Sequence, residues 1–329
     1  MDQNINMETI SCADYEAHQK FEKEVIHGLK DNPKHLFSKY FYDQKGDVLF
    51  QQIMNMPEYY LTGCELEIFT DKKEEIAQAI KAFDTPFDLV ELGAGDATKS
   101  SHLLEYLVDW KADFTYMPID ISGNIISVLQ ERLSKEIPTL DLIGLNGEYF
   151  EMLDKANSIS SRRKVILFLG GNIGNMEVEE AYQFCSELRK KLNPGDILLI
   201  GFDLKKDPDI ILSAYNDKAG ITAAFNLNLL ERINSELDAR FDISKFKHYQ
   251  TYDPLSGACR SYLISLEEQH VRIGNQFIDF KENEAIYMEI SQKYAPEETD
   301  GMALKNGFQP VKYIADPKGW FIDAIWKVV

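Results

Sequence analysis

The spacing of apolar residues predicts strands that alternate with helices from residue 87 to about residue 204. Phe87 to Leu92 is a short apolar run bounded by turn residues, which is typical of a buried strand. Similar runs follow, separated by helical segments such as TKSSHLLEYLVDW, and they are FTYMPIDIS, LDLIGLNG, KVILFL and DILLIGFDL. This alternation favours βαβ units, and therefore an α/β fold with a doubly wound, mostly parallel sheet and helices on both faces.

The regions that flank this alternating segment follow other patterns. The first sixty residues indicate helices and loops without a strand, and ELEIFTDKKEEIAQAIKAF has the apolar spacing of a helix that ends before Pro86. Residues 207 to about 291 are richer in Asn and Asp and less regular, which suggests an inserted subdomain. The tail holds two β-rich runs around the turn at residues 316–319, and we expect a hairpin that completes the sheet.

Composition limits the classes of partner. At roughly 150 residues per domain, 329 residues predict about two domains. The net charge of −19 opposes binding to nucleic acid or anionic lipid, and no apolar run reaches the roughly 18 residues of a membrane span. The four cysteines and six histidines are scattered without metal-ligand spacing. We therefore expect a cytoplasmic monomer that binds a small molecule and no metal.

A glycine-rich turn directly follows the first predicted strand. Gly93 and Gly95 would let the backbone approach a ligand at the carboxyl edge of the sheet, and Asp120, which ends the next strand, could bind a ribose diol there. A dinucleotide fingerprint requires a third glycine, but that position is Thr98. The pattern therefore suits an adenosyl cofactor without phosphates better than NAD, although a tight turn without a ligand would also use such glycines.

A second group of candidate residues lies near other strand ends. Gly170 to Asn175 is a dense run of small and amide residues after a predicted strand, and the stretch from Tyr215 to Asn228 is rich in asparagine. Tyr59 and Tyr60 are adjacent, and Glu289 and Ser291 would share one face of a strand. Each of these groups taken alone fits a structural role, such as helix capping, at least as well as a binding role.

Taken together, these blocks resemble the histidine-specific, S-adenosylmethionine-dependent α-N-methyltransferases of ergothioneine biosynthesis. The resemblance covers nearly the whole chain and rests on YDQKGDVLFQQIMNMPEYY, ELGAGDATK, YMPIDIS, FLGGNIGN, DLKKDP, AYNDKAGITAAFNLNLL and EISQKY. It implies a class I methyltransferase sheet with a second, mostly helical α+β domain made of two separate pieces. The expected bounds are 63–205 with 294–329 for the cofactor domain, and 1–62 with 206–293 for the substrate domain.

The resemblance also implies site residues. It assigns S-adenosylmethionine to Gly93, Gly95, Lys99, Asp120, Glu148 and Tyr149, with Asp120 on the ribose and the last two residues beside the adenine. The substrate α-carboxylate would bind Asn175 and Tyr215, near Gly170. Tyr59 and Tyr42 would line the reacting α-amine, whereas Glu289 and Ser291 would bond an imidazole.

Three departures from the family pattern bear on the substrate. Leu61-Thr62-Gly63 replaces Pro-Thr-Arg, Glu148 replaces aspartate, and Ser261 replaces a methionine of the substrate pocket. The implied reaction is three methyl transfers to L-histidine, which give trimethylhistidine (hercynine). The alternatives are the same chemistry on another aromatic amino acid or amine, an NAD-dependent oxidoreductase, and a cofactor-binding protein without turnover.

Overall fold

The computed structural model describes residues 12–329, which divide into two compact units. The larger, here called the large-sheet unit, comprises Pro57–Ile211, Tyr252–Cys259 and Ile290–Val329. The small-sheet unit comprises the described residues up to Met56, Leu212–Thr251 and Arg260–Glu289. The chain passes between the units several times, and some of its strands cross a border. Each unit is therefore assembled from separate pieces of the chain.

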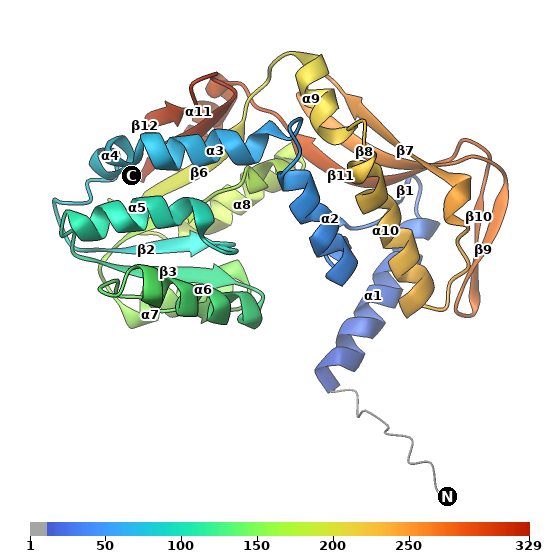
Figure 1. The fold of residues 1–329 in the computed structure, drawn as a ribbon, viewed down its shortest axis with the longest axis horizontal. Coiled ribbons are helices and arrows are strands. Elements are labelled where there is room, and N and C mark those ends of the chain that lie inside the picture. The colour runs from blue at the N-terminus through green and yellow to red at the C-terminus, as the bar shows by residue number, and fades with distance from the viewer. Residues whose placement is uncertain (1–11) are drawn as a thin grey trace, which may run out of the picture. The chain divides into compact units, whose positions relative to one another are not determined.

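The large-sheet unit is built around an open sheet, which has seven strands among the residues that the structure describes (Figure 1). The strand order is β12-β13-β6-β5-β2-β3-β4, with parallel pairing from β6 to β4 and antiparallel pairing of β12 with β13 and of β13 with β6. The bounds are β2 Phe87–Leu92, β3 Phe114–Asp120, β4 Leu145–Asn146, β5 Arg163–Phe168, β6 Ile197–Asp203, β12 Phe308–Ala315 and β13 Phe321–Val328. The chain order reverses at β2, and α/β sheets bind ligands beyond the carboxyl ends of strands at such a point.

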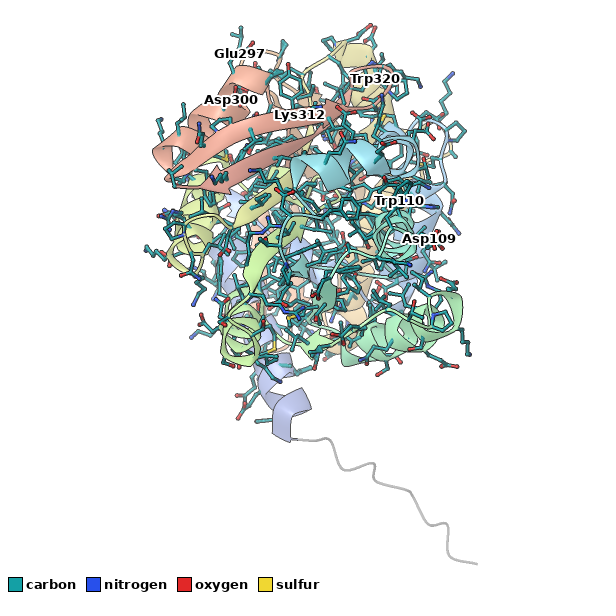
Figure 2. All side chains as sticks on the ribbon, turned by 90° about the vertical axis from the view of Figure 1, so that its left-hand side faces the viewer. Asp109, Trp110, Glu297, Asp300, Lys312 and Trp320 are labelled. Atoms are coloured by element: carbon teal, nitrogen blue, oxygen red, sulfur yellow. The ribbon has the colours of Figure 1, made fainter. Side chains whose placement is uncertain are left out.

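Helices cover both faces of this sheet. Their bounds are α3 Tyr60–Asp71, α4 Lys73–Ala79, α5 Thr98–Asp109, α6 Gly123–Glu136, α7 Tyr149–Ile159, α8 Val178–Lys190 and α11 Pro296–Lys305, with a short 3-10 helix, η2, at Asn172–Asn175. Helix α3 packs against α5 and β13, and α7 packs against β2 and β3. Exposed side chains at the ends of two helices include the acidic residues Asp109 of α5 and Glu297 of α11 and the apolar Trp110, which follows α5 (Figure 2).

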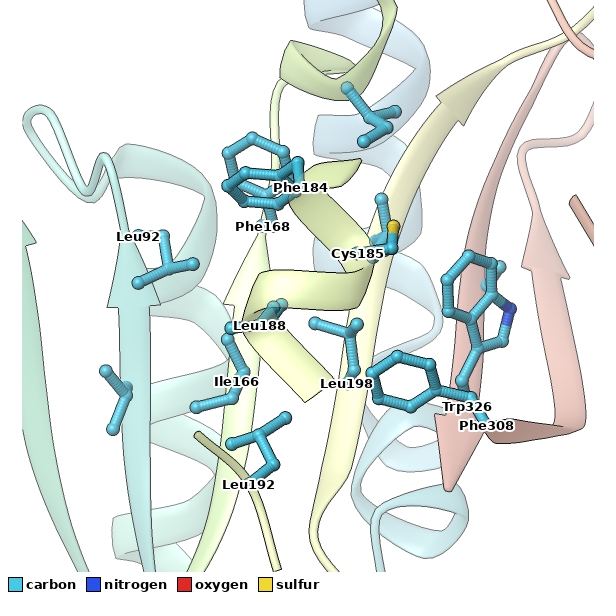
Figure 3. Close-up of a cluster of buried hydrophobic side chains, with 14 of the residues drawn as sticks. Leu92, Ile166, Phe168, Phe184, Cys185, Leu188, Leu192, Leu198, Phe308 and Trp326 are labelled. Carbon is cyan, nitrogen blue, oxygen red and sulfur yellow. The ribbon is translucent and has the colours of Figure 1, made fainter. Parts of the chain in front are cut away.

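One face of the sheet is closed by an apolar layer (Figure 3). Side chains that alternate along β2, β5 and β6 point toward α7, α8 and α11, because successive strand residues face opposite sides. Phe168 on β5 stacks on Phe184 of α8, with ring centroids 4.7 Å apart, and Trp326 of β13 lies near Phe308. These rings have almost no exposed surface, so this layer supplies most of the apolar burial that holds the sheet to its helices.

The small-sheet unit combines helices with an antiparallel hairpin and with a sheet, four-stranded within the described residues, in which β1 pairs with β11 in parallel. Its elements are α1 Cys12–Lys30, β1 Lys34–His35, η1 Ser38–Tyr40, α2 Gln44–Met54, α10 Ile221–Glu236, η3 Ile243–Lys245, β9 Gln269–Ile273 and β10 Gln276–Phe280. Four further elements begin or end in the other unit and are α9 Pro208–Tyr215, β7 Phe246–Tyr252, β8 Ala258–Ser265 and β11 Ala285–Gln292. The sheet order is β1-β11-β8-β7, and β9 pairs with β10 as a hairpin. Helices α2 and α10 pack together.

The structure confirms the predicted α/β fold class, the strands at 87–92 and 114–120 and the C-terminal hairpin. The single helix expected after residue 64 is instead two helices, α3 and α4. The first begins at Tyr60, and Lys72 separates the two with a φ of −116° and a ψ of 11°. The strand expected in LDLIGLNG shrinks to Leu145–Asn146. The prediction that the first sixty residues contain no strand is wrong, because Lys34–His35 pairs with β11.

The segment predicted to be irregular is largely regular. Residues 207–291 form two helices and the strands β7 to β11, so the second unit holds more strand than the sequence indicated. Residues 57–62, 206–211, 252–259 and 290–293 group with the large-sheet unit. In the first of these segments, the Tyr60 hydroxyl donates to Asp203 at the end of β6.

Candidate active site

The first predicted site element is the glycine turn between β2 and α5. Gly93 and Gly95 have φ angles of +71° and +53°, a region that residues with a Cβ avoid. A Cβ on residue 93 would also lie 2.7 Å from the Tyr149 hydroxyl oxygen. Helix α5 then begins after Ala97, whose side chain provides no cap, and the N–H of Thr98 donates to the carboxylate of Asp96 at 3.0 Å. The turn is therefore shaped for close approach of a ligand to the backbone.

Asp120 lies at this turn, as predicted. One of its carboxylate oxygens accepts a hydrogen bond from the Gly95 N–H at 3.2 Å and the other from the Ser122 N–H at 2.9 Å. Burial and the negative charges of Asp120 and Glu148 raise the pKa of Tyr149. The structure thus brings Gly93, Gly95, Asp120 and Tyr149 together at the carboxyl ends of β2 and β3, and Glu148 directly precedes Tyr149 at the start of α7.

Lys99 has a partner that the sequence did not reveal. Its ammonium is paired with Glu65 of α3, whose side chain is 1% exposed, while about a quarter (26%) of the Lys99 side chain is accessible. Both Glu65 oxygens also accept the N–H of Gly170, at 2.8 and 2.9 Å. Burial opposes the charged form of Lys99, but Glu65 outweighs it and raises the pKa. Glu65 lies among the buried residues of α3. An acidic residue at an apolar position of a predicted helix was the sequence signal that could have identified it.

Two more buried carboxyl groups lie near this pair. Burial raises the pKa of Glu91 on β2 to about 7, whereas hydrogen bonds from Tyr116 and Ser100 lower it in part. Burial and the charge of Glu65 raise the pKa of Asp323 on β13 well above its usual range. Neither residue was predicted as a site residue, although an acid between apolar neighbours in a strand is a recognisable signal.

The loop after β5 forms the second predicted site element. Gly170 and Gly171 have φ angles of +81° and +65°, and the chain then enters η2, which ends at the exposed Asn175. A Cβ on Gly174 would lie 2.8 Å from the carbonyl oxygen of Gln292, so this loop packs tightly against the end of β11. Gly170 and Asn175 therefore lie on one rigid loop at the carboxyl end of β5.

Ser291 is held by a buried charge network that the sequence did not reveal. The Lys293 ammonium donates to the Ser291 hydroxyl at 2.7 Å and lies 2.6 Å from the carboxylate of Asp203. The same carboxylate accepts from Lys206 at 2.5 Å and from the Tyr60 hydroxyl at 2.8 Å. Because an ammonium has no lone pair, Ser291 must be the acceptor in its contact with Lys293, so its own proton points elsewhere.

In the small-sheet unit, Tyr42 and Glu289 lie close enough to interact electrostatically. Loss of hydration and the charges of Glu289 and Asp47 raise the pKa of Tyr42, although 47% of the residue is exposed. Glu289 and Ser291 lie on the half-exposed face of β11, as their spacing predicted. Tyr215 is the last residue of α9.

Tyr59, predicted to orient the amine, lies in the large-sheet unit. It precedes the first residue of α3 and is partly buried. Its neighbour Tyr60 points instead to Asp203. Only Tyr59 of the adjacent pair therefore remains a candidate for the substrate, while Tyr60 belongs to the charge network around Asp203.

Ser261 is fully buried in the small-sheet unit, at 1% exposure. Its hydroxyl donates to Asn226 on α10 at 2.9 Å and lies 2.8 Å from Nε2 of His248 on β7. Burial lowers the pKa of His248 to about 4, so the ring is neutral near pH 7. Where the family pattern has methionine, this chain thus has a hydrogen-bonded group of three polar residues.

Within residues 12–329, no helix combines the length and apolar character needed to cross a membrane. Among the same residues, no three His, Cys, Asp or Glu side chains form a group that could hold a metal ion.

The arrangement fits an adenosyl ligand that carries an amino-acid group. Asp120 offers a carboxylate oxygen beside a glycine turn that only a residue without Cβ can form. Lys99 offers a partly accessible ammonium in the first turn of α5. Together they would bind a ribose diol and a carboxylate, and the sheet edge between them has no side chain at Gly93 or Gly95.

Comparisons with known proteins agree with this geometry. The chain matches a model of "Histidine-specific methyltransferase, SAM-dependent" over residues 21–328. It is 34% identical over 319 residues to a histidine N-alpha-methyltransferase of Mycolicibacterium smegmatis, covering 95% of this chain and 98% of that protein. It is also 33% identical over 307 residues to the enzyme of that name from Mycobacterium tuberculosis, covering 93% and 94%.

A more distant relative has a different named substrate. This chain is 28% identical over 221 residues to a 4-dimethylallyltryptophan N-methyltransferase of Claviceps fusiformis, covering 64% of this chain and 61% of that protein. The family model nevertheless spans nearly all of the chain. The chain is therefore a member of the histidine-specific, S-adenosylmethionine-dependent methyltransferase family.

Proposed function

We propose that this enzyme transfers three methyl groups, one after another, from S-adenosylmethionine to the α-amine of L-histidine, which gives trimethylhistidine (hercynine). The observation that carries this proposal is the similarity to two histidine N-alpha-methyltransferases over more than nine-tenths of each chain. The turn at Gly93 and the partly accessible ammonium of Lys99 support it independently. Family membership leaves the NAD-dependent oxidoreductase without support.

The residues at the sheet edge would bind the cofactor. When bound, S-adenosylmethionine supplies an electrophilic methyl group on a sulfonium. Asp120 would accept hydrogen bonds from the ribose, Gly93 and Gly95 would allow close approach, and Lys99 would pair with the cofactor carboxylate. Tyr149 and Glu148 would lie beside the adenine.

The chain needs no covalent nucleophile for this reaction, because methyl transfer is an in-line displacement by the substrate nitrogen. Its task is to hold a neutral amine in line with the methyl carbon. The pKa of Tyr42 is raised, so its hydroxyl stays protonated near neutral pH and orients the amine instead of acting as a base. We assign Tyr59 the same orienting role.

Glu289 and Ser291 on β11 would select the substrate side chain, because the first would accept a hydrogen bond from it and the second would donate one to it. Glu289 is an acceptor when ionised, whereas Lys293 makes Ser291 a donor away from itself. A neutral imidazole has one N–H donor and one nitrogen acceptor, and matches this pair. Phenylalanine and leucine offer neither, and a site that bonds polar atoms can reject such substrates by roughly 10⁴-fold. Asn175 and Tyr215, with Gly170 nearby, would bind the α-carboxylate.

The second candidate substrate is another aromatic amino acid. Ser261 is smaller than methionine, and a relative acts on a tryptophan derivative by its name. Against this, Ser261 is already bonded to His248 and Asn226, so its hydroxyl is satisfied within the protein.

A competition assay distinguishes the two candidates. The enzyme, S-adenosylmethionine and an equimolar mixture of free amino acids are incubated, and methylated products are identified by mass spectrometry. We expect histidine to be consumed first, with mono-, di- and trimethylhistidine in succession. Preferential methylation of tryptophan would favour the second candidate, and cofactor binding without any product would favour a binding protein.

Glu289→Gln tests the recognition of the imidazole. The amide keeps the size of the side chain but loses the charge, so we expect kcat/KM for histidine to fall by about tenfold to a hundredfold. Tyr42→Phe is the comparison variant: because Tyr42 is assigned to the amine and not to the imidazole, it should lower kcat/KM without changing the preference for histidine. If Glu289→Gln left the preference for histidine unchanged, the assignment would be wrong.

We also propose that residues 63–205 and 294–329 carry the cofactor, and that residues 1–62 and 206–293 contribute most substrate contacts. A cytoplasmic monomer that does not bind nucleic acid is our further proposal, supported by the net charge of −19 and the buried free thiols of Cys64, Cys185 and Cys259. Light scattering after gel filtration would determine the oligomeric state, and a filter-binding assay with duplex DNA would test the charge argument.

A further inference from the structure

We infer that Glu65 is a positioning residue that couples the cofactor turn to the loop after β5. The inference rests on the proposed roles of Lys99 at the cofactor and of the Gly170 to Asn175 loop at the substrate. Glu65 itself touches neither ligand in this proposal. It acts through the two groups to which its carboxylate is bonded.

The carboxylate of Glu65 joins two separate segments of the large-sheet unit. On one side it pairs with Lys99, which stands in the first turn of α5 after the glycine turn. On the other side both oxygens accept the N–H of Gly170, at 2.8 and 2.9 Å. These segments follow β2 and β5, which are parallel neighbours in the sheet. One buried side chain therefore fixes the positions of two adjacent loops.

The surroundings are shaped to keep Glu65 in this position. A Cβ on residue 201 of β6 would lie 2.4 Å from a Glu65 oxygen, so glycine at that position makes room for the carboxylate. Gly170, which follows the end of β5 directly after Leu169 and has a φ of +81°, donates its N–H to Glu65. Leu61 and Ile68 on the same face of α3 are buried and anchor the helix.

The charge of Glu65 matters as much as its shape. Glu91 and Asp323 are also buried near Lys99, but burial favours their neutral forms. Glu65 is the carboxylate in direct contact with the Lys99 ammonium, and it holds that group where α5 begins. A bound carboxylate would then meet an ammonium whose position is already fixed, which reduces the entropy lost on binding.

The experiment measures two ligands that share the 5′-thioadenosine part. S-adenosylhomocysteine carries an aminocarboxypropyl chain with its carboxylate on the sulfur, whereas 5′-methylthioadenosine has a methyl group there and lacks both the carboxylate and the α-ammonium. For Glu65→Gln we expect the calorimetric Kd of S-adenosylhomocysteine to rise about tenfold or more, the size of one charge-assisted hydrogen bond. The Kd of 5′-methylthioadenosine should change less than about twofold. The KM for histidine should rise as well, since the loop at Gly170 loses its anchor.

Three further variants separate positioning from folding. In a Lys99→Met background, Glu65→Gln should add almost nothing to the Kd of S-adenosylhomocysteine, because Glu65 acts through Lys99. Glu65→Asp keeps the charge but shortens the reach, and should fall between wild type and Glu65→Gln. Asp88→Asn is the matched control, because Asp88 is a buried carboxylate paired with Lys164 at the opposite end of β2 and should affect neither ligand.

Equal weakening of both ligands by Glu65→Gln, or unchanged affinity for both, would overturn the inference. If Lys99→Met weakens S-adenosylhomocysteine and Glu65→Gln does not, the inference fails while the proposed cofactor site stands. If Lys99→Met also leaves the Kd unchanged, both the role of Lys99 and the inference are wrong. Should Glu65→Gln fold poorly by circular dichroism, Glu65→Asp decides the same question: the inference requires it to weaken S-adenosylhomocysteine more than 5′-methylthioadenosine.

Discussion

Two buried ion pairs lie at opposite ends of the same parallel strands and differ in how completely they are enclosed. At the amino ends, Asp88 of β2 faces Lys164 of β5 at 2.9 Å, with side-chain exposures of 1% and 2%. The Lys164 ammonium also donates to the carbonyl oxygens of Ser160 and Arg162. Both side chains are thus almost fully enclosed, and the ammonium is bonded to two backbone carbonyl oxygens, which is typical of a structural ion pair.

At the carboxyl ends, the pair of Glu65 and Lys99 is open on one side. Glu65 is enclosed, but Lys99 remains 26% exposed. Further carboxyl groups, Glu91 and Asp323, lie close by with raised pKa values. The difference favours the carboxyl ends of the strands as the ligand-binding side, because perturbed and incompletely enclosed charges at a strand-end turn are typical of a binding site.

The largest expected effect is at the closed end. Lys164→Met leaves the Asp88 carboxylate buried without its partner, so we expect the free energy of unfolding to fall by about 3–5 kcal/mol. Urea titration followed by circular dichroism measures this. The Kd of S-adenosylhomocysteine should not change at temperatures where the variant is folded. A clear loss of affinity in the folded variant would contradict the division between the two ends.

The next effect depends on pH and concerns Glu91. Its pKa is about 7 in the folded chain and 4.5 in its ordinary state, so the folded chain binds more protons between these values. Stability therefore falls as the pH rises from about 4.5 to 7, by about 3 kcal/mol at 1.4 kcal/mol per tenfold change in proton affinity. Glu91→Gln should remove this fall, and so gain about 3 kcal/mol over wild type between pH 4 and pH 8. If the free energy of unfolding instead depends on pH in the same way in both proteins, Glu91 is ionised in the folded chain and the prediction is wrong.

A smaller effect tests the room made for Glu65. Gly201→Ala places a methyl group 2.4 Å from a Glu65 oxygen and 2.9 Å from the Phe321 ring. We expect a loss of about 1–3 kcal/mol in the free energy of unfolding. The displaced carboxylate should also weaken S-adenosylhomocysteine more than 5′-methylthioadenosine. Gly301→Ala is a control with open space around the new Cβ.

The smallest effect is expected for an exposed pair. Lys135 and Glu131 are i and i+4 neighbours on α6 with side chains 72% and 71% exposed. Lys135→Gln should change the free energy of unfolding by less than about 0.5 kcal/mol, because water screens the interaction. A thermal melt measures this change, and a loss comparable to that of Lys164→Met would show that burial is not what separates these pairs.

Much of the fold could be predicted from local pattern, whereas the partners of charged side chains could not. The strand at Phe87–Leu92 is a continuous apolar run because both faces are covered, so its sequence indicates its environment. Lys34–His35 carries no such pattern, because its pairing with β11 joins segments about 250 residues apart.

The same limit applies to the candidate site. Asp120 and Gly95 follow neighbouring strands, so their contact could be predicted from topology. The contacts of Glu65 with Lys99 and Gly170 span 34 and 105 residues and depend on how α3 packs, which no local pattern encodes. For Ser291 the sequence supplied the residue, but the hydrogen bond that its hydroxyl oxygen accepts from Lys293 is seen only in the three-dimensional structure.

The most direct test of the proposed function uses S-adenosylmethionine with a trideuterated methyl group. The enzyme is incubated with this cofactor and L-histidine, and the product is fragmented in a mass spectrometer. The proposed function predicts up to three labelled methyl groups, all on the α-nitrogen and none on the imidazole. Label on the ring, or histidine that remains unmodified by folded, cofactor-bound enzyme, would contradict it.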